Sequence, residues 1–304
     1  MAPFASFQGI YTALVTPFID GKIDYGSLKN LIERQCASGI QGLVLAEITG
    51  ENPTLSDEER KELLSFVVQT VGGRLQLLMT VDANDTRRAL EQIIAYETLG
   101  ADGFLAVTPF YNQPMQSGLY LHFEAIAKAT DKPICLYSSP FRCGVEIAPE
   151  TVRRLRENHK NIVAIQENGS SCNRVAQLVK ENDADFRVLT GEDVMMLPFF
   201  SLGAKGLVSV AANLIPNEIV QLYRFVSENN FEAAADLHRR YYALFRALTI
   251  ETNPVPIKYL LQRRGLIKSA EVHLPLCPLS EGSVAVMERV FKEAKSLDSE
   301  TLET

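Results

Sequence analysis

The sequence Gly100-Ala101-Asp102-Gly103-Phe104-Leu105-Ala106-Val107 carries the pattern that decides the fold. A helix-like stretch ends on the first glycine, two residues follow, and the second glycine begins a short apolar strand. The first glycine suits a left-handed helix C-cap, and the second lets the strand start close to its neighbour. The same module recurs at residues 39–45 and 203–210. We therefore interpret it as a junction from a helix to a strand.

Five further apolar runs of strand length bring the predicted strands to eight. They alternate with amphipathic helices, of which residues 57–71 and 86–98 are the clearest. Because the runs are continuously apolar, both faces of each strand are predicted to be buried, as in a parallel sheet covered by helices. Eight such units predict an α/β fold, the (β/α)8 TIM barrel. The predicted strands are residues 11–15, 43–45, 76–81, 104–107, 133–137, 162–165, 187–189 and 207–210.

After residue 210 the pattern becomes wholly helical. No linker, low-complexity run or charge block divides the chain. We expect a barrel over residues 1–212 and a C-terminal helical region over residues 213–304. The predicted C-terminal helices are residues 216–229, 231–248, 255–264 and 281–297.

Composition argues against several classes of partner. The formal net charge is −7, whereas nucleic acid and anionic membranes attract a surplus of Lys and Arg. The longest apolar runs are far shorter than the roughly 20 residues of a membrane helix. Residues 1–4 carry no basic segment of an export signal, so we expect a cytoplasmic protein. The cysteines and histidines lack metal-binding or redox spacing, so we expect no metal and no cofactor, and a small soluble molecule as partner.

Candidate site residues follow the predicted strands, because the carboxyl ends of barrel strands form the working face. The second strand runs into residues 46–51, Ala-Glu-Ile-Thr-Gly-Glu, whose turn offers backbone N–H groups and the Thr49 hydroxyl to a carboxylate. An ordinary strand-to-helix loop is the alternative. The fifth strand ends in Tyr137, a candidate proton shuttle, with Arg142 as a bidentate carboxylate anchor. A buried tyrosine is more often simply part of a core.

Further motifs follow in the same order: Thr49-Gly50-Glu51 with Pro53-Thr54-Leu55, residues 107–112 running to 116–123, and residues 137–144, 190–193 and 251–258. Taken together, these motifs resemble the dihydrodipicolinate synthase and N-acetylneuraminate lyase family over nearly the whole chain. Tyr111 and Arg142 resemble the synthase branch more than the sialic acid lyases. The resemblance implies a class I aldolase-type enzyme of lysine biosynthesis, in which a lysine ending the sixth strand binds pyruvate and condenses it with aspartate semialdehyde. It also implies a homotetramer or homodimer in which Tyr111 reaches the adjacent subunit's site.

The sequence departs from this pattern where the chemistry is expected. Gln166 stands at the position of the Schiff-base lysine, and a carboxamide nitrogen is not nucleophilic. Ile48 replaces the threonine of the proton relay, and a methyl group cannot relay protons. Glu47 replaces a glycine and would repel an anionic keto acid if it pointed inward. Because all three positions differ, we favour natural divergence over an engineered inactive variant.

Three hypotheses follow for the function. The first is a 4-hydroxy-tetrahydrodipicolinate synthase by descent, without normal Schiff-base activity. The second is a non-catalytic paralogue that binds a small keto-acid-like molecule or serves as a partner in a hetero-oligomer. The third is a different lyase with Glu47 and Tyr137 as a non-covalent acid/base pair. The catalytic positions are Tyr137, Tyr111 and Gln166, and the substrate-binding positions are Thr49, Gly50, Arg142, Glu47, Ile48 and Val208.

Two neighbouring carboxylates are assigned structural roles. Glu167 follows Gln166 in its strand, so its side chain should alternate to the outer face and pack toward the helices. Glu192 and Asp193 follow the seventh strand and could act as acid/base residues, but we favour a carboxylate that caps the helix beginning at Asp193.

Overall fold

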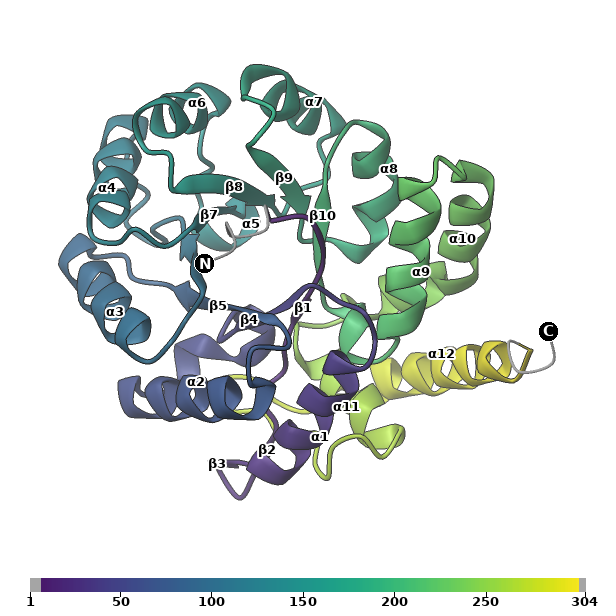
Figure 1. The fold of residues 1–304 in the computed structure, drawn as a ribbon. Helices are drawn as coiled ribbons and strands as arrows, with labels where there is room; N and C mark the ends of the chain where they lie inside the picture. The colour runs from purple at the N-terminus through teal and green to yellow at the C-terminus, as the bar shows by residue number, and fades with distance from the viewer. Residues whose placement is uncertain (1–6, 301–304) are drawn as a thin grey trace.

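The computed structural model describes residues 7–300, with side chains for residues 7–293. In this part of the chain, parallel strands close into a barrel, which Figure 1 shows as a ring surrounded by helices. The predicted (β/α)8 barrel is therefore confirmed. In barrel order the strands are β1 (Gly9–Ala13), β10 (Gly206–Ser209), β9 (Arg187–Thr190), β8 (Ile162–Glu167), β7 (Ile134–Ser138), β6 (Gly103–Val107), β5 (Gln76–Val81) and β4 (Gly42–Leu45).

One helix of the outer ring follows each barrel strand. A further short helix, α5 (Pro140–Cys143), lies between β7 and α6. The predicted helices over residues 57–71 and 86–98 are confirmed at both ends. The ring consists of α1 (Tyr25–Cys36), α2 (Asp57–Val71), α3 (Thr86–Thr98), α4 (Gln116–Lys128), α6 (Pro149–Asn158), α7 (Cys172–Glu181), α8 (Met196–Ser201) and α9 (Pro216–Ser227).

The C-terminal region is helical, as expected. It contains α10 (Phe231–Ala247), α11 (Val255–Arg263) and α12 (Glu281–Glu300), and α12 packs against α10 and α11 outside the ring (Figure 1). The boundary after residue 212 stays a prediction. Helix α9, which follows that boundary, packs against both β1 and α10. Among the described helices, none combines the length and the apolar character that a membrane span requires.

A small antiparallel hairpin was not predicted from the sequence. It pairs β2 (Phe18–Ile19) with β3 (Lys22–Ile23). The two turn residues, Asp20 and Gly21, both have positive φ, at 52° and 73°. An Asp-Gly pair is the usual sequence signal for this two-residue turn. The Asp20-Gly21 pair was therefore a signal for this turn. The hairpin was not predicted because each of its strands is only two residues long.

Side chains alternate between the interior of the barrel and the surrounding helices. The interior is filled by one cluster, which includes Tyr11, Val44, Leu105, Ala164 and Val208. The outward residues of the same strands belong to a second, larger cluster with the helices. Because the interior is packed, any ligand site must lie at an end of the barrel.

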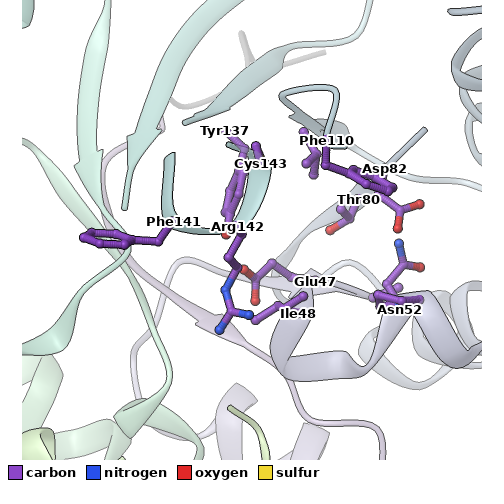
Figure 2. Close-up of a pocket in the computed structure, with 13 residues that line it drawn as sticks. Glu47, Ile48, Asn52, Thr80, Asp82, Phe110, Tyr137, Phe141, Arg142 and Cys143 are labelled. Carbon is purple, nitrogen blue, oxygen red and sulfur yellow. The ribbon is translucent and has the colours of Figure 1, made fainter. Parts of the chain in front are cut away.

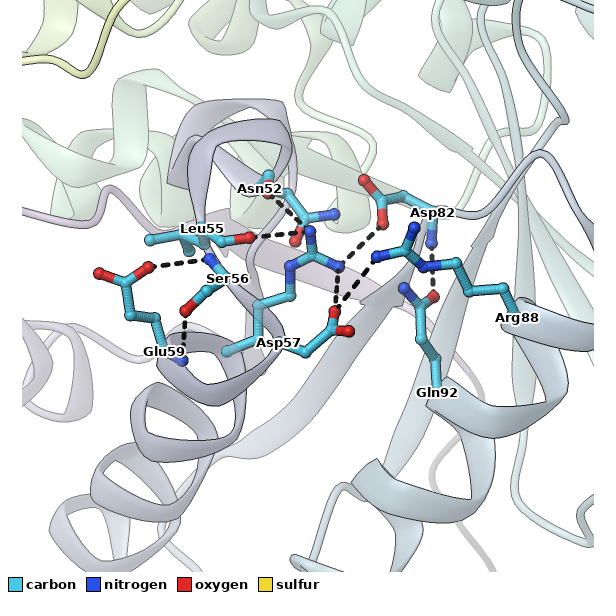
Figure 3. A network of polar contacts seen from close by, with 9 residues as sticks. Asn52, Leu55, Ser56, Asp57, Glu59, Asp82, Arg88 and Gln92 are labelled. Carbon is cyan, nitrogen blue, oxygen red and sulfur yellow. Dashed lines mark hydrogen bonds and ion pairs between the residues drawn. The ribbon is translucent and has the colours of Figure 1, made fainter.

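A buried arginine fixes the loop between β4 and α2. The Arg60 guanidinium donates to the carbonyls of Asn52 at 3.2 Å and Leu55 at 2.9 Å, and it lies 3.6 Å from the Asp82 carboxylate. Ser56 and Glu59 form a capping box at the start of α2, as Figure 3 shows. This network holds the turn after β4 against the end of β5. The short helix η1 (Ile48–Gly50) in that turn is thereby positioned at the barrel mouth.

Candidate active site

Two adjoining cavities open at the carboxyl ends of the barrel strands. The larger has a volume of about 330 Å³ and the smaller about 130 Å³. Glu47, Ile48 and Arg142 line both, so the cavities meet at these side chains. Figure 2 shows the larger cavity, with the Arg142 guanidinium beside Glu47 and Ile48, and with Asp82 on the opposite side.

Gln166 lies at the end of β8 and lines the smaller cavity. Its side chain is 1% exposed, and β8 pairs it with Tyr137 of β7. The Gln166 Nε2 donates to Asn168 Oδ1 at 2.9 Å. The Gln166 Oε1 is buried and has no hydrogen-bond partner among the described residues. The predicted Schiff-base position is thus inside the barrel mouth and holds an amide with a free acceptor.

Glu47 points inward and occupies the turn that was predicted to bind a ligand carboxylate. Its Oε2 accepts hydrogen bonds from the Thr49 backbone N–H and the Thr49 hydroxyl, both at 3.0 Å. The Thr49 hydroxyl in turn accepts a hydrogen bond from Asn253 Nδ2 at 2.9 Å. Both Thr49 donors are therefore engaged by a carboxylate of the chain itself.

Burial dominates the electrostatics of Glu47. Loss of solvent raises the pKa of its carboxyl, while the hydrogen bonds from Thr49 and the nearby Arg142 and Tyr137 act in the opposite direction. Burial and the Glu47 charge also raise the pKa of the Tyr137 hydroxyl well above its ordinary value. Tyr137 is therefore a neutral hydrogen-bonding group at the end of β7.

The structure brings most of the predicted positions together. Besides Glu47, Ile48 and Arg142, Tyr137 lines the larger cavity, and Thr49, Gln166 and Val208 line the smaller one.

Two predicted positions lie outside the cavities. Tyr111 lines neither cavity and its side chain is 90% exposed in the single chain. Gly50 also lines neither cavity, and its carbonyl accepts a hydrogen bond from the Thr16 hydroxyl at 2.8 Å. A Cβ at Gly50 would lie 3.1 Å from the Leu14 carbonyl, so this glycine packs the turn against the chain after β1.

Six further polar residues line the smaller cavity but were not among the predicted site residues: Asn168, Glu192, Asp193, Arg246, Thr249 and Asn253. Asn168 and Glu192 closely follow β8 and β9, so their position at the end of a predicted strand could have identified them as site residues. Asn253 comes from the loop before α11, which no strand pattern could place at the mouth.

The carboxylates after β9 have unequal surroundings. Burial and the neighbouring charge of Asp193 raise the pKa of Glu192 to about 7. Asp193 accepts hydrogen bonds from the Ser209 hydroxyl and from the backbone N–H groups of Val210 and Ala211. The prediction that Asp193 caps the helix following it is wrong. Its carboxylate instead holds the turn after β10, because β9 and β10 are neighbours in the barrel.

Among the described residues, no lysine lines either cavity. Lys258 is buried, but it forms an ion pair with Glu51 and donates to the Glu271 carbonyl at 2.9 Å. Burial lowers the pKa of Lys258 to about 8. Within the same residues, no cluster of His, Cys, Asp and Glu is arranged to hold a metal ion.

A closed parallel barrel with polar side chains gathered at the carboxyl ends of its strands places this chain in the (β/α)8 barrel class, whose sites occupy that face. The model of the dihydrodipicolinate synthetase family matches residues 6–294. The chain belongs to this family.

Individual relatives agree with this membership. The 4-hydroxy-tetrahydrodipicolinate synthase of Fervidobacterium nodosum is 41% identical over 94% of this chain and 98% of its own length. The structure of the enzyme of that name from Methylacidiphilum fumariolicum has a TM-score of 0.94 at 44% identity, covering 95% of this chain and 96% of that one. The chloride-inhibited dihydrodipicolinate synthase of Acinetobacter baumannii, complexed with pyruvate, has a TM-score of 0.92 at 35% identity, covering 95% and 99%.

Proposed function

We propose that this chain is a divergent member of its family that binds a small carboxylic acid at the barrel mouth without forming an imine. One observation carries the proposal: the side chain that β8 presents to the smaller cavity is the carboxamide of Gln166. Imine formation needs a nucleophilic amine, and an amide nitrogen is not one. The absence of lysine from both cavity linings, among the described residues, supports the same conclusion.

Two neighbouring residues support a loss of the ancestral condensation. Ile48 places an apolar side chain between the two cavities, where the resemblance implies a relay hydroxyl. Glu47 uses the N–H and hydroxyl of Thr49 that would otherwise hold a ligand carboxylate. The exposed Arg142 guanidinium is left as the anchor for a carboxylate.

The proposal includes assembly with further copies. The side chain of Tyr111 is 90% exposed in the single chain, which fits a residue that completes an adjacent subunit's site. We propose a homodimer or homotetramer in the cytoplasm on the strength of the family resemblance.

Borohydride trapping tests the loss of imine chemistry. Treatment with pyruvate and borohydride should leave the intact mass of the protein unchanged. Without a lysine in the cavity, no imine forms that borohydride could reduce to a stable adduct. Gln166→Lys is the positive control and should gain the mass of a reduced pyruvate adduct. A pyruvate adduct on the unaltered chain would overturn the proposal.

The same variants test the relay. Gln166→Lys alone should condense pyruvate with aspartate semialdehyde only slowly, because Ile48 cannot pass a proton. Gln166→Lys combined with Ile48→Thr should be faster than the single variant. Full turnover by the single variant would show that Ile48 does not limit the reaction.

A second candidate function is a non-covalent lyase reaction with Glu47 and Tyr137 as the acid/base pair. The proximity of the two groups and the raised pKa of buried Glu47 favour it. Any turnover found with a candidate substrate should then be lost in Glu47→Gln. A Glu47→Gln variant that kept this turnover would remove Glu47 from the role of base.

A further inference from the structure

Two side-chain amides of the smaller cavity leave buried oxygen acceptors without a partner in the described part of the chain, while Arg142, Arg246 and Thr249 supply donors to its lining. The side-chain amides of Gln166 and Asn253 both direct their nitrogens to partners within the protein, Asn168 Oδ1 and Thr49 Oγ1. The oxygens, Gln166 Oε1 and Asn253 Oδ1, are buried and have no hydrogen-bond partner among the described residues. Both residues line the cavity. Each amide nitrogen thus uses one of its two N–H groups within the protein, whereas each oxygen is a buried acceptor with no partner among the described residues.

The neighbouring hydrogen bonds fix the orientation of Asn253. The Thr49 hydroxyl spends its one proton on Glu47 Oε2. It can therefore only accept from Asn253, which requires the Asn253 nitrogen, and not its oxygen, to face Thr49. Glu47 consequently sets which atom of Asn253 is left without a partner.

Glu192 adds a carboxylate to the same cavity. In the described part of the chain its side chain has no ion pair. The carboxylates of Asp193 and Glu47 and the guanidinium of Arg142 are the charges that act on it. Asp193 accepts from three donors and Glu47 from two, so Glu192 is the carboxylate of this cavity without a hydrogen-bond donor among the described residues.

We propose that the ligand of this cavity is an α-amino acid, with its ammonium group bound by Gln166 Oε1, Asn253 Oδ1 and Glu192, and its carboxylate bound by Arg142. An ammonium has three N–H donors and no acceptor, so it matches these three groups. A keto acid has only acceptors here, and it would leave buried oxygens unpaired at a cost of about 1–3 kcal/mol each. This inference rests on the proposed function, since a covalently bound keto acid would occupy the same space.

The larger cavity accommodates the side chain of such a ligand. It shares Arg142 and Ile48 with the smaller cavity, and Val107 and Phe110 give it an apolar wall. At the far side it is lined by the side chains of Asn52 and Asp82 (Figure 2). An amino acid with an apolar stem therefore fits across both cavities.

Matched pairs of probes test the class of ligand. Binding of pyruvate and L-alanine, and of 2-oxobutyrate and L-2-aminobutyrate, is measured by calorimetry on the full chain at pH 8. Within each pair only the keto and ammonium groups differ. We expect the amino acid to bind at least about tenfold more tightly, since each hydrogen bond to a charged group is strong in a site shielded from water.

The Glu192→Gln variant tests how much the charge of the Glu192 carboxylate contributes to binding. It should weaken binding of both amino acids about tenfold or more and leave the keto acids unaffected or bound more tightly. Glu232→Gln is the matched control, because Glu232 is exposed in the first turn of α10. Its amino acid affinity should equal that of the unaltered chain, and circular dichroism checks that both variants fold.

Three results would overturn the inference: keto acids binding as tightly as amino acids, Glu192→Gln leaving amino acid affinity unchanged, or no saturable binding of any amino acid probe. Tighter reversible binding of pyruvate would leave the loss of imine chemistry intact. An imine adduct in the borohydride experiment would overturn the proposed function itself, so the two failures are distinguishable.

Discussion

Gln166 and Glu167 are adjacent in β8, are both 1% exposed, and lie on opposite faces of the strand. Glu167 faces the helices, where its Oε2 accepts from Arg174 Nε at 2.9 Å. Arg174 is satisfied further by the Ser138 hydroxyl at 3.2 Å and the Ile147 carbonyl at 2.7 Å. Gln166 faces the barrel mouth, where its oxygen has no partner among the described residues.

The difference separates polar groups that hold the fold from those available to a ligand. A buried charge is tolerated on the outer face because its hydrogen bonds are made within the chain. At the mouth, buried acceptors stay unpaired and the Glu192 carboxyl has a raised pKa, so the site carries a cost in stability. Substituting a polar residue on the outer face of the barrel should therefore lower the free energy of unfolding. A substitution at the barrel mouth should leave it nearly unchanged or raise it.

The largest effect is expected from Arg174→Met. It removes the guanidinium that pairs with the buried Glu167 carboxylate and donates to the Ile147 carbonyl, and the free energy of unfolding should fall by roughly 3–5 kcal/mol at pH 8. Urea denaturation followed by circular dichroism measures it. The double variant Glu167→Gln with Arg174→Met is the control, since it leaves no buried carboxylate unpaired and should recover part of the loss. A loss below about 1 kcal/mol for the single variant would show that the pair is not structural.

A smaller effect of opposite sign is expected from Glu192→Gln. The pKa of Glu192 is about 7 in the folded chain, raised from 4.5, so the folded state holds its proton more tightly than the unfolded state. Its ionisation therefore costs stability as pH rises from about 4.5 to about 7, and the full cost is present above that range. Glu192→Gln should raise the free energy of unfolding by on the order of 1–3 kcal/mol at pH 8.

The pH dependence of this gain is the sharper measurement. Near pH 4 Glu192 is protonated in both states, so the variant and the unaltered chain should unfold at nearly the same urea concentration. Glu232→Gln, exposed on α10, should show no such dependence. An equal gain at both pH values would mean that the charge of Glu192 is not the cause.

The barrel was predictable because its signals are local. Glycine junctions such as Gly100 and Gly103 mark where each helix ends and the next strand begins, and apolar runs mark the strands. Strand periodicity also placed Gln166 inside and Glu167 outside, as the ion pair with Arg174 confirms. Local patterns decide which face of an element a side chain occupies.

The hydrogen bonds of the mouth were not predictable, because they join distant parts of the chain. Asn253 reaches Thr49 across 204 residues. Asp193 binds the turn after β10, and not its own helix, because the barrel order brings that turn close. Glu47 was expected to repel a ligand if it pointed inward, but no pattern indicated that it would occupy the Thr49 donors.

The smallest effect on stability is expected from Gln166→Met, a substitution of similar volume at the centre of the site. It removes one hydrogen bond, to Asn168, and one buried oxygen that has no partner, so the two terms nearly cancel. The free energy of unfolding should change by less than about 1 kcal/mol, while amino acid binding at the mouth should be lost. Urea denaturation and calorimetry on the same preparation measure the two quantities. A loss of stability comparable to that of Arg174→Met would mean that Gln166 is a structural residue, and the contrast between the two faces of β8 would fail.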